Sequence, residues 1–235
     1  MTHPHAHEPE THPMPGSNGE HALQERYGTV ARARSFYRRQ VLDRLNESMR
    51  EFIARQEMCF VATADAAGEC DCSFRAGPPG FVRALDEHTL LYAEYRGNGV
   101  MASLGNLDEN PHIGILFVDF FQDVIGLHVN GYAKIMPDPA MRLAHPILPV
   151  DTVPGRRAER WVSVHLEEAY IHCAKHIPRL AKLPRDRSWG TDDARRKGGD
   201  FFGVKEDNAR AWAGDEPAVE ALDTADACCA AAQMS

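Results

Sequence analysis

The residues best suited to chemistry lie between positions 75 and 119, where glycine-rich connections carry arginine, asparagine and serine. Two of these connections follow short apolar runs and read RAGPPGF at residues 75–81 and YRGNG at residues 95–99. Glycine lets a backbone approach a ligand closely, and the planar fork of an arginine side chain matches the oxygens of a phosphate. This pattern predicts a sheet whose loops hold a phosphorylated cofactor.

The second connection lies between a predicted strand and a short predicted helix over residues 99–107. A helix N-terminus offers unpaired N–H groups and the positive end of the helix dipole, which suit a phosphate. Arg96 adds charge, and Asn98 and Ser103 add donors. Asn98 also suits the N-cap of the helix, and both roles stay open for it. No Walker lysine and no Gly-x-Gly-x-x-Gly after a parallel strand is present, which excludes P-loop and Rossmann sites.

The first connection can also be read without a ligand, as a hairpin turn stiffened by Pro78 and Pro79. Arg75 stands directly before this turn, and Arg83 follows on the next predicted strand. Two cations flanking a glycine-rich loop favour the interpretation in which the loop contacts an anionic ligand.

Alternation of apolar and polar residues predicts the elements that must position these loops. One amphipathic helix is expected over residues 34–56, and a second short helix around residues 141–147. The expected strands cover residues 58–64, 69–75, 81–85, 89–93, 112–119, 124–136 and 161–171. Their spacing and turn signals predict a mainly β fold with flanking helices, built as an antiparallel meander that forms a small barrel or sandwich.

Composition narrows the class of protein. The 235 residues carry a formal net charge of -8, which argues against a general nucleic-acid binder. No run is long and apolar enough to span a membrane, and the N-terminus lacks the pattern of a secretory signal, so we expect a cytoplasmic protein. None of the 6 cysteines has Cys-x-x-Cys spacing, and we expect free thiols and no metal site of that kind.

The chain divides into a leader, a folded domain and an extension. Residues 1–20 are rich in His and Pro and are expected to be disordered, residues 21–180 form the domain, and residues 181–235 form a polar, partly disordered extension. The leader carries His3, His5, His7 and His12, which could bind a transition metal weakly. A solvated tail is the favoured interpretation, and a metal-handling protein is the weakest of the hypotheses for the whole chain.

Taken in order, the motifs resemble those of the pyridoxamine 5'-phosphate oxidase-related family, the FMN-binding split β-barrels. The resemblance rests on RAGPPGF, YRGN, the SLGN helix at residues 103–106, LFVDF at residues 116–120 and HCAKHIP at residues 172–178. It covers about residues 20–180 and implies an FMN bound in a groove at a homodimer interface.

The resemblance also implies roles for particular residues. Arg75 would be the strand arginine at the phosphate, and Lys175 could approach a flavin oxygen. The residues that match the phosphate loop are Arg96, Gly97 and Asn98, with Ser103 as a further contact. Those placed along the isoalloxazine ring or ribityl chain are Ala76, Gly77 and Phe81.

The implied function is a flavin-dependent oxidoreductase that acts on an unidentified small molecule, with no catalytic residue assigned. The flavin carries the redox chemistry, so no catalytic triad is needed. The Arg-x-Val-Leu-Leu-Lys strand and Ser-Arg-Lys loop of the vitamin B6 oxidases are missing, which argues against pyridoxamine phosphate oxidation. Two alternatives stay open. One is binding of FAD or F420 in place of FMN, including an F420-dependent reductase. The other is a non-catalytic flavin- or haem-binding protein that uses His112, His128, His172 and His176.

Overall fold

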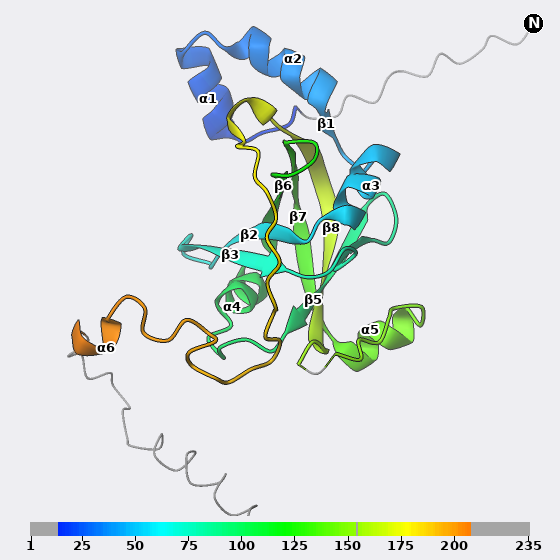
Figure 1. Ribbon diagram of the computed structural model, residues 1–235. Helices are drawn as coiled ribbons and strands as arrows, with labels where there is room; N and C mark the ends of the chain where they lie inside the picture. The colour runs from blue at the N-terminus through cyan, green and yellow to red at the C-terminus, as the bar shows by residue number, and fades with distance from the viewer. Residues whose placement is uncertain (1–13, 154, 208–235) are drawn as a thin grey trace, which may run out of the picture. The chain divides into compact units, whose positions relative to one another are not determined.

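The computed structural model describes residues 14–153 and 155–207. The chain divides into one unit that ends at Gly190 and another that begins at Thr191. The first unit is built on an 8-stranded sheet whose paired strands are antiparallel (Figure 1). Its strands are β1 (Val41–Leu42), β2 (Met58–Ala64), β3 (Cys70–Ala76), β4 (Val82–Ala84), β5 (Thr89–Tyr95), β6 (His112–Asp119), β7 (Ile125–Pro137) and β8 (Ala158–His172).

The strand order is β3-β2-β6-β7-β8-β5-β4, and β1 also pairs with β8. The sheet curls around a single main apolar core as a split barrel, which confirms the predicted fold class. The register between β7 and β8 shifts at Asn130 and Gly131, where the backbones come very close. A Cβ atom on Gly131 would lie 2.1 Å from the carbonyl oxygen of His165, so only glycine fits this bulge.

The helices of the first unit lie around the sheet. They are α1 (Asn18–Arg26), α2 (Val30–Gln40), α3 (Glu47–Arg55), α4 (Ala102–Glu109), α5 (Asp138–Ala144) and the short 3-10 helix η1 (Ala174–His176), and the second unit contains α6 (Val204–Asp207). The sequence did not predict α1, and α5 begins and ends earlier than the helix expected around residues 141–147.

The single helix predicted over residues 34–56 is wrong, because the chain leaves α2 and enters strand β1. Val41 and Leu42 pair with Tyr170 and Ala169 of β8 instead of continuing the helix. A new helix, α3, then begins after Asn46, whose side chain accepts a hydrogen bond from Met49 N.

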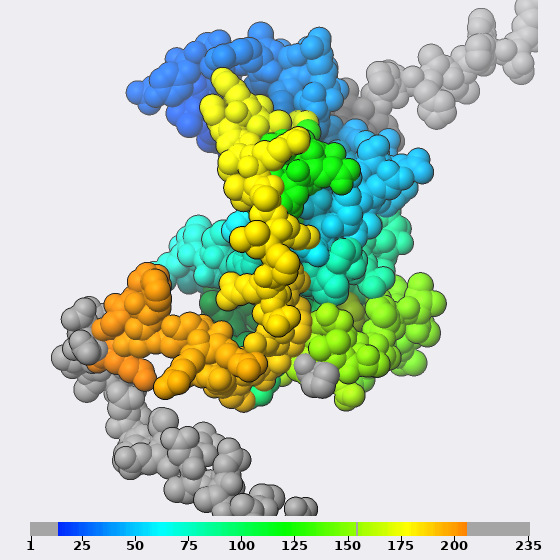
Figure 2. All heavy atoms as spheres, viewed as in Figure 1, coloured from blue at the N-terminus to red at the C-terminus, as the bar shows by residue number. Residues whose placement is uncertain are grey.

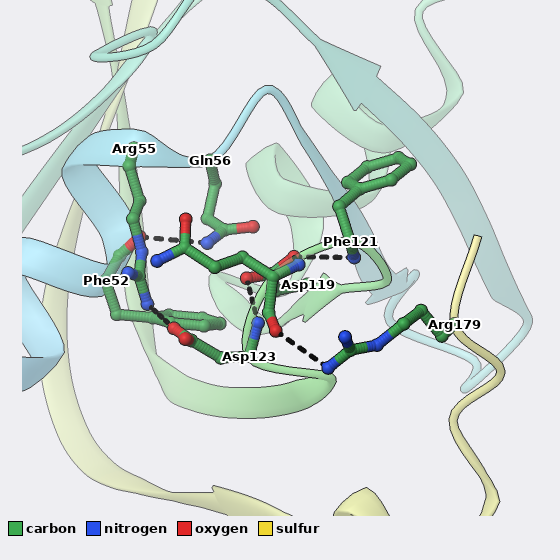
Figure 3. Close-up of polar contacts among 8 residues, drawn as sticks. Phe52, Arg55, Gln56, Asp119, Phe121, Asp123 and Arg179 are labelled. Atoms are coloured by element: carbon green, nitrogen blue, oxygen red, sulfur yellow. Dashed lines mark hydrogen bonds and ion pairs between the residues drawn. The ribbon is translucent and has the colours of Figure 1, made fainter. Parts of the chain in front are cut away.

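The turn between β6 and β7 is held by a cluster of polar contacts (Figure 3). The carboxylate of Asp119 accepts hydrogen bonds from the backbone N–H groups of Phe121, Gln122 and Asp123 at 2.8–3.0 Å. Burial alone would raise the pKa of Asp119, but these donors outweigh it and hold that pKa below its ordinary value. The side chain of Asp123 forms an ion pair with Arg55 at the end of α3, which joins the turn to the helix.

Residues 178–190, here called the strap, follow η1 and lie along the surface of the first unit (Figure 2). Leu180 donates a backbone hydrogen bond to Phe120 O at 2.8 Å, which anchors the strap to the β6–β7 turn. At the far end of the strap, the ring of Trp189 meets the ring of Tyr95 edge to face at 5.4 Å. The strap therefore reaches from the β6–β7 turn to the end of β5.

The predicted leader and extension are described only in part. Residues 1–13, with His3, His5, His7 and His12, and residues 208–235 lie outside the described residues. At the end of the predicted leader, residues 18–20 already belong to α1, which Ser17 and Glu20 begin with a capping box. Among the described residues, no helix is both long and apolar enough to cross a bilayer.

Candidate functional site

Arg75 lies at the end of β3, opposite Cys59 of β2, and its charge is paired inside the protein. Its Nε donates a hydrogen bond to Glu94 Oε1 of β5 at 2.9 Å. The side chains of Arg75 and Glu94 are 22% and 11% exposed, so water screens the pair only weakly. Glu94 therefore already balances the charge of Arg75, the arginine that we predicted to contact the phosphate.

Two further polar groups stand beside this ion pair. Tyr92 precedes Glu94 on the same face of β5, and its hydroxyl is buried with no hydrogen-bond partner among the described residues. Burial raises the pKa of Tyr92 far above its ordinary value, and the nearby Glu94 adds to the effect. Burial also raises the pKa of the Cys59 thiol to about 12, so this cysteine stays protonated and unreactive.

Ser103, predicted to contact the cofactor, is buried in the first turn of α4 and turned toward β3. Its hydroxyl lies 3.1 Å from Asp71 Oδ2 and 2.9 Å from Ser73 Oγ, and Ser73 also donates to Asp71 at 2.7 Å. The Ser73 hydroxyl contributes most to holding the pKa of Asp71 below its ordinary value. The hydroxyl of Ser103 therefore donates its hydrogen bond to an ionised carboxylate. Only the backbone N–H of Ser103 is left to bind an anion.

The loop of residues 96–100 is exposed and leads directly into α4. Asn98 does not cap this helix, so its predicted capping role is wrong: its Oδ1 accepts from Val100 N at 3.0 Å within the loop. The N-cap residue is Met101, in the left-handed conformation with φ 58, and no side chain caps the helix. Arg96 and Gly97 are both exposed at the start of this loop.

The loop of residues 76–81 is packed more tightly than its exposed counterpart. Gly77 is buried, and a Cβ atom there would lie 2.3 Å from the Cβ of Phe81. Gly77 N donates to Glu57 O at 3.0 Å, and Phe81 N donates to Pro78 O at 2.9 Å. Phe81 belongs to the main core, and Ala76 is the last residue of β3. The glycine is thus required by internal packing, whether or not a ligand also contacts the loop.

A pocket of about 320 Å³ lies beside this loop and is lined by three arginines. Arg142 pairs with Asp138, and Arg156 pairs with Asp151. Arg83, in contrast, makes no hydrogen bond or ion pair within the part of the chain that the structure describes. The partly buried Tyr95 and the almost completely buried Trp161 also line the pocket, which therefore combines apolar surface with the unpaired positive charge of Arg83.

Lys175 and the predicted histidines lie elsewhere. Lys175 is exposed in η1, after the end of β8 that pairs with Gly126, whereas Tyr95 pairs with the opposite end of this 15-residue strand. Lys175 and Arg96 are therefore not brought together within one chain.

Two of the four histidines of the haem hypothesis meet in the structure. His128 Nε2 and His172 Nδ1 are 2.9 Å apart, and the His128 ring stacks on Tyr170 at 4.7 Å. Burial, and then the neighbouring His172, lower the pKa of His128. His112 instead packs against Tyr132 at 4.6 Å, and His176 is exposed in η1.

The residues that the sequence reasoning missed are Tyr92, Glu94 and Asp71. Glu94 had a visible signal, because it is the acidic residue in the otherwise uncharged run of residues 89–95. Asp71 had a weaker one, since it alternates with Ser73 and Arg75 on the same face of β3. Together these residues form a group of polar side chains at the edge of the core, between β3, β5 and α4.

Some of these hydrogen-bond donors suit the phosphate of an FMN better than others. The uncapped N-terminus of α4 and the exposed Arg96 loop suit a phosphate. The side chain of Ser103 does not, because it already donates to Asp71. Arg75 can offer only the guanidinium nitrogens that do not face Glu94.

The sheet order and the helix between β5 and β6 define a split β-barrel protein. The family model described as pyridoxamine 5'-phosphate oxidase matches residues 45–173, more than half of the chain. The chain belongs to this family, as its motifs predict.

A search of curated proteins finds no match to this chain. Among solved structures, HupZ of Group A Streptococcus is 20% identical, covering 58% of this chain and 99% of its own, with a TM-score of 0.40. The heme storage protein HutZ from Vibrio cholerae is 15% identical, and the match covers 55% of this chain and 94% of HutZ, with a TM-score of 0.34. An FMN-binding protein from Syntrophomonas wolfei is 10% identical, and the match covers 66% of this chain and 97% of that protein, with a TM-score of 0.36.

Proposed function

We propose that this protein is an FMN-binding oxidoreductase that acts on a small anionic molecule. The observation that carries the proposal is the convergence of three features at the end of β5. Glu94 holds Arg75, Tyr95 lines the arginine pocket, and Arg96 begins the loop that leads to the uncapped N-terminus of α4. Cofactor and substrate contacts would thus share one short stretch of backbone.

The protein's part in the reaction would be to bind and orient. The backbone N–H groups at the start of α4, with Arg96, would hold the phosphate. Bound there, the flavin supplies the redox chemistry itself. Asp71 stays ionised beside α4 and keeps the Ser103 side chain turned toward β3, so the phosphate would meet backbone donors and not this hydroxyl.

The pocket beside residues 76–81 would receive the substrate. Arg83 is the cation there without an ion-pair partner among the described residues, and a carboxylate or phosphate on the substrate would provide one. Tyr95 is only partly buried and offers a flat ring against which a planar molecule can pack.

We also propose a homodimer located in the cytoplasm. The outward face of the sheet exposes Phe74 and Tyr132 to 56% and 41%, which favours an interface between two copies. Lys175 could contact the flavin only from the partner chain, because it lies at the other end of β8 from Arg96. The cysteines of the described residues are free, as expected in a reducing compartment.

The test is titration of the purified full-length protein with FMN, followed by flavin fluorescence, in wild type and two arginine variants. Arg96→Ala should weaken FMN binding by about 10- to 100-fold, the value of a charge-assisted phosphate contact. Arg83→Ala removes an equal charge from the substrate pocket and should leave FMN affinity unchanged. Equal effects of the two variants would show that the phosphate position is misassigned.

The same titration separates the alternative cofactors. F420 in place of FMN is detected by competition, since both would need the N-terminus of α4. Haem is tested by its visible spectrum. The contact between His128 and His172 is the observation that supports haem as an alternative cofactor. If haem binds there, His172→Ala should abolish the visible spectrum of bound haem. A protein that binds none of these cofactors would refute the proposed function.

A further inference from the structure

A second pocket, of about 350 Å³, lies at the end of the sheet where β7 begins and β8 ends. Its volume is within the range of small-molecule sites. The walls come from β1, α3, β7 and β8, and they are mostly apolar. The apolar side chains that line it are Leu42, Met49, Phe52, Ile125, Leu127 and Ile171.

The floor of this pocket is part of the main core. Phe52 and Leu127 belong to the buried core cluster, and Met49 and Ile125 pack against it. Apolar surface of this kind is normally covered, because contact with water costs free energy in proportion to its area. A pocket that opens onto core side chains therefore favours an apolar occupant.

One wall of the pocket is strained and firmly supported. Val124, directly before Ile125, has φ 54, a left-handed conformation that is a genuine outlier for a β-branched residue. Such strain persists only where neighbouring contacts hold it in place, and it is concentrated at binding sites. Here the contacts of Asp119 with the turn and the ion pair of Asp123 with Arg55 supply that support (Figure 3). The Arg55 guanidinium also lies 5.2 Å above the Phe52 ring, which ties the support to the pocket floor.

The rim of the pocket carries one positive charge. Arg39, near the end of α2, lines the opening together with Gln40, Asn46 and Ser48. Arg39 makes no hydrogen bond or ion pair within residues 14–153 and 155–207. Asn46 Oδ1 is already used to cap α3. An apolar cavity with a single available cation at its mouth matches a molecule with an apolar body and one acidic end.

We propose that this pocket binds a small aliphatic carboxylate, with its chain against Leu127 and Phe52 and its acid group on Arg39. The site lies at the opposite end of β8 from the Arg96 loop of the same chain, so it does not overlap the position proposed there for the flavin phosphate.

The experiment is isothermal titration calorimetry of the full-length protein with sodium decanoate, below its micelle concentration, and with 1-decanol as the uncharged probe. Decanoate should bind in a saturable, one-to-one manner, and decanol more weakly. Arg39→Glu should reduce decanoate affinity by at least about tenfold, since it replaces a charge-assisted contact with repulsion. Arg38→Glu is the matched control, because it makes the same charge change on the neighbouring residue of α2, which lines a different cavity.

A second variant fills the pocket from its exposed side. Ser48 is exposed in the first turn of α3 and lines the pocket, so Ser48→Trp should abolish decanoate binding without disturbing the core. No decanoate binding by wild type, or equal affinities of Arg39→Glu and Arg38→Glu, would overturn the proposal. It is also overturned if Arg39→Glu dissociates a dimer in sedimentation while decanoate affinity stays the same, since the pocket would then be an interface between copies.

Discussion

Neutralising Glu94 should destabilise the protein, because it breaks the ion pair and leaves the largely buried guanidinium of Arg75 without a counter-charge. Breaking a fully buried pair costs about 3–5 kcal/mol, whereas an exposed pair contributes about 0–1 kcal/mol. Arg75 keeps 22% and Glu94 only 11% of the side-chain surface exposed, so the pair is nearer the buried limit. Glu94→Gln preserves size and one acceptor, and we expect a loss of about 2–3 kcal/mol in the free energy of unfolding.

The measurement is urea unfolding followed by circular dichroism, supported by thermal melts. For a domain of this size the expected loss lowers the melting temperature by about 4–12 °C. Glu87→Gln is the control: this glutamate is exposed on the turn between β4 and β5 and should change stability by less than about 0.5 kcal/mol.

A double-mutant cycle decides the physical reason. Removing both charges, with Arg75→Gln and Glu94→Gln together, should cost less than the sum of the two single changes, because no unpaired charge is left. If Glu94→Gln unfolds like wild type, or if the losses simply add, the account of Arg75 as a neutralised arginine is wrong.

Two further predictions concern pH. The folded-state pKa of Asp119 is lowered, so its stabilising effect is present above the unfolded value of about 3.9 and is lost as pH falls through the folded pKa. Asp119→Asn should therefore cost about 1–3 kcal/mol at pH 7 and much less near pH 2 in urea unfolding; equal losses at both pH values would contradict this. The folded-state pKa of His128 is lowered from about 6.5, so its contribution is complete above that pH and declines as pH falls toward the folded pKa. His128→Gln should show a smaller drop in melting temperature between pH 7.5 and 5 than wild type, and an unchanged drop would refute the role of this histidine.

The strands were predictable because the two faces of each strand differ in polarity. Residues 58–64 and 112–119 match β2 and β6 at both ends, since apolar and polar residues alternate there between clear turn signals. The helix predicted over residues 34–56 failed because Val41 and Leu42 satisfy the helical spacing and the strand pairing equally well. Asn46 followed by Met49 was the available cap signal for a second helix.

The site was predictable only as a list of residue types. Arg75 and Glu94 are 19 residues apart, and Asp71 and Ser103 are 32 apart. Their contacts depend on how the sheet curls, which brings β3 toward β5 and α4. Local spacing carries no information on that curvature. Sequence reasoning therefore selected Arg75 and Ser103 as candidates but could not show that the side chain of each is already hydrogen-bonded within the protein.

The place of β8 in the sheet has a consequence for the order in which the chain can fold as it is synthesised. Within the part of the chain that the structure describes, the β4–β5 hairpin joins the other strands only through β8, and β8 is the last strand to be synthesised. Strands β2, β3, β6 and β7 can pair early, but the hairpin must wait until residues 158–165 of β8 are available. Until then Tyr92 and Glu94 remain outside the barrel. A nascent chain that stalls before β8 would expose the edges of β5 and β7, and the Arg75–Glu94 pair would be among the last contacts to form.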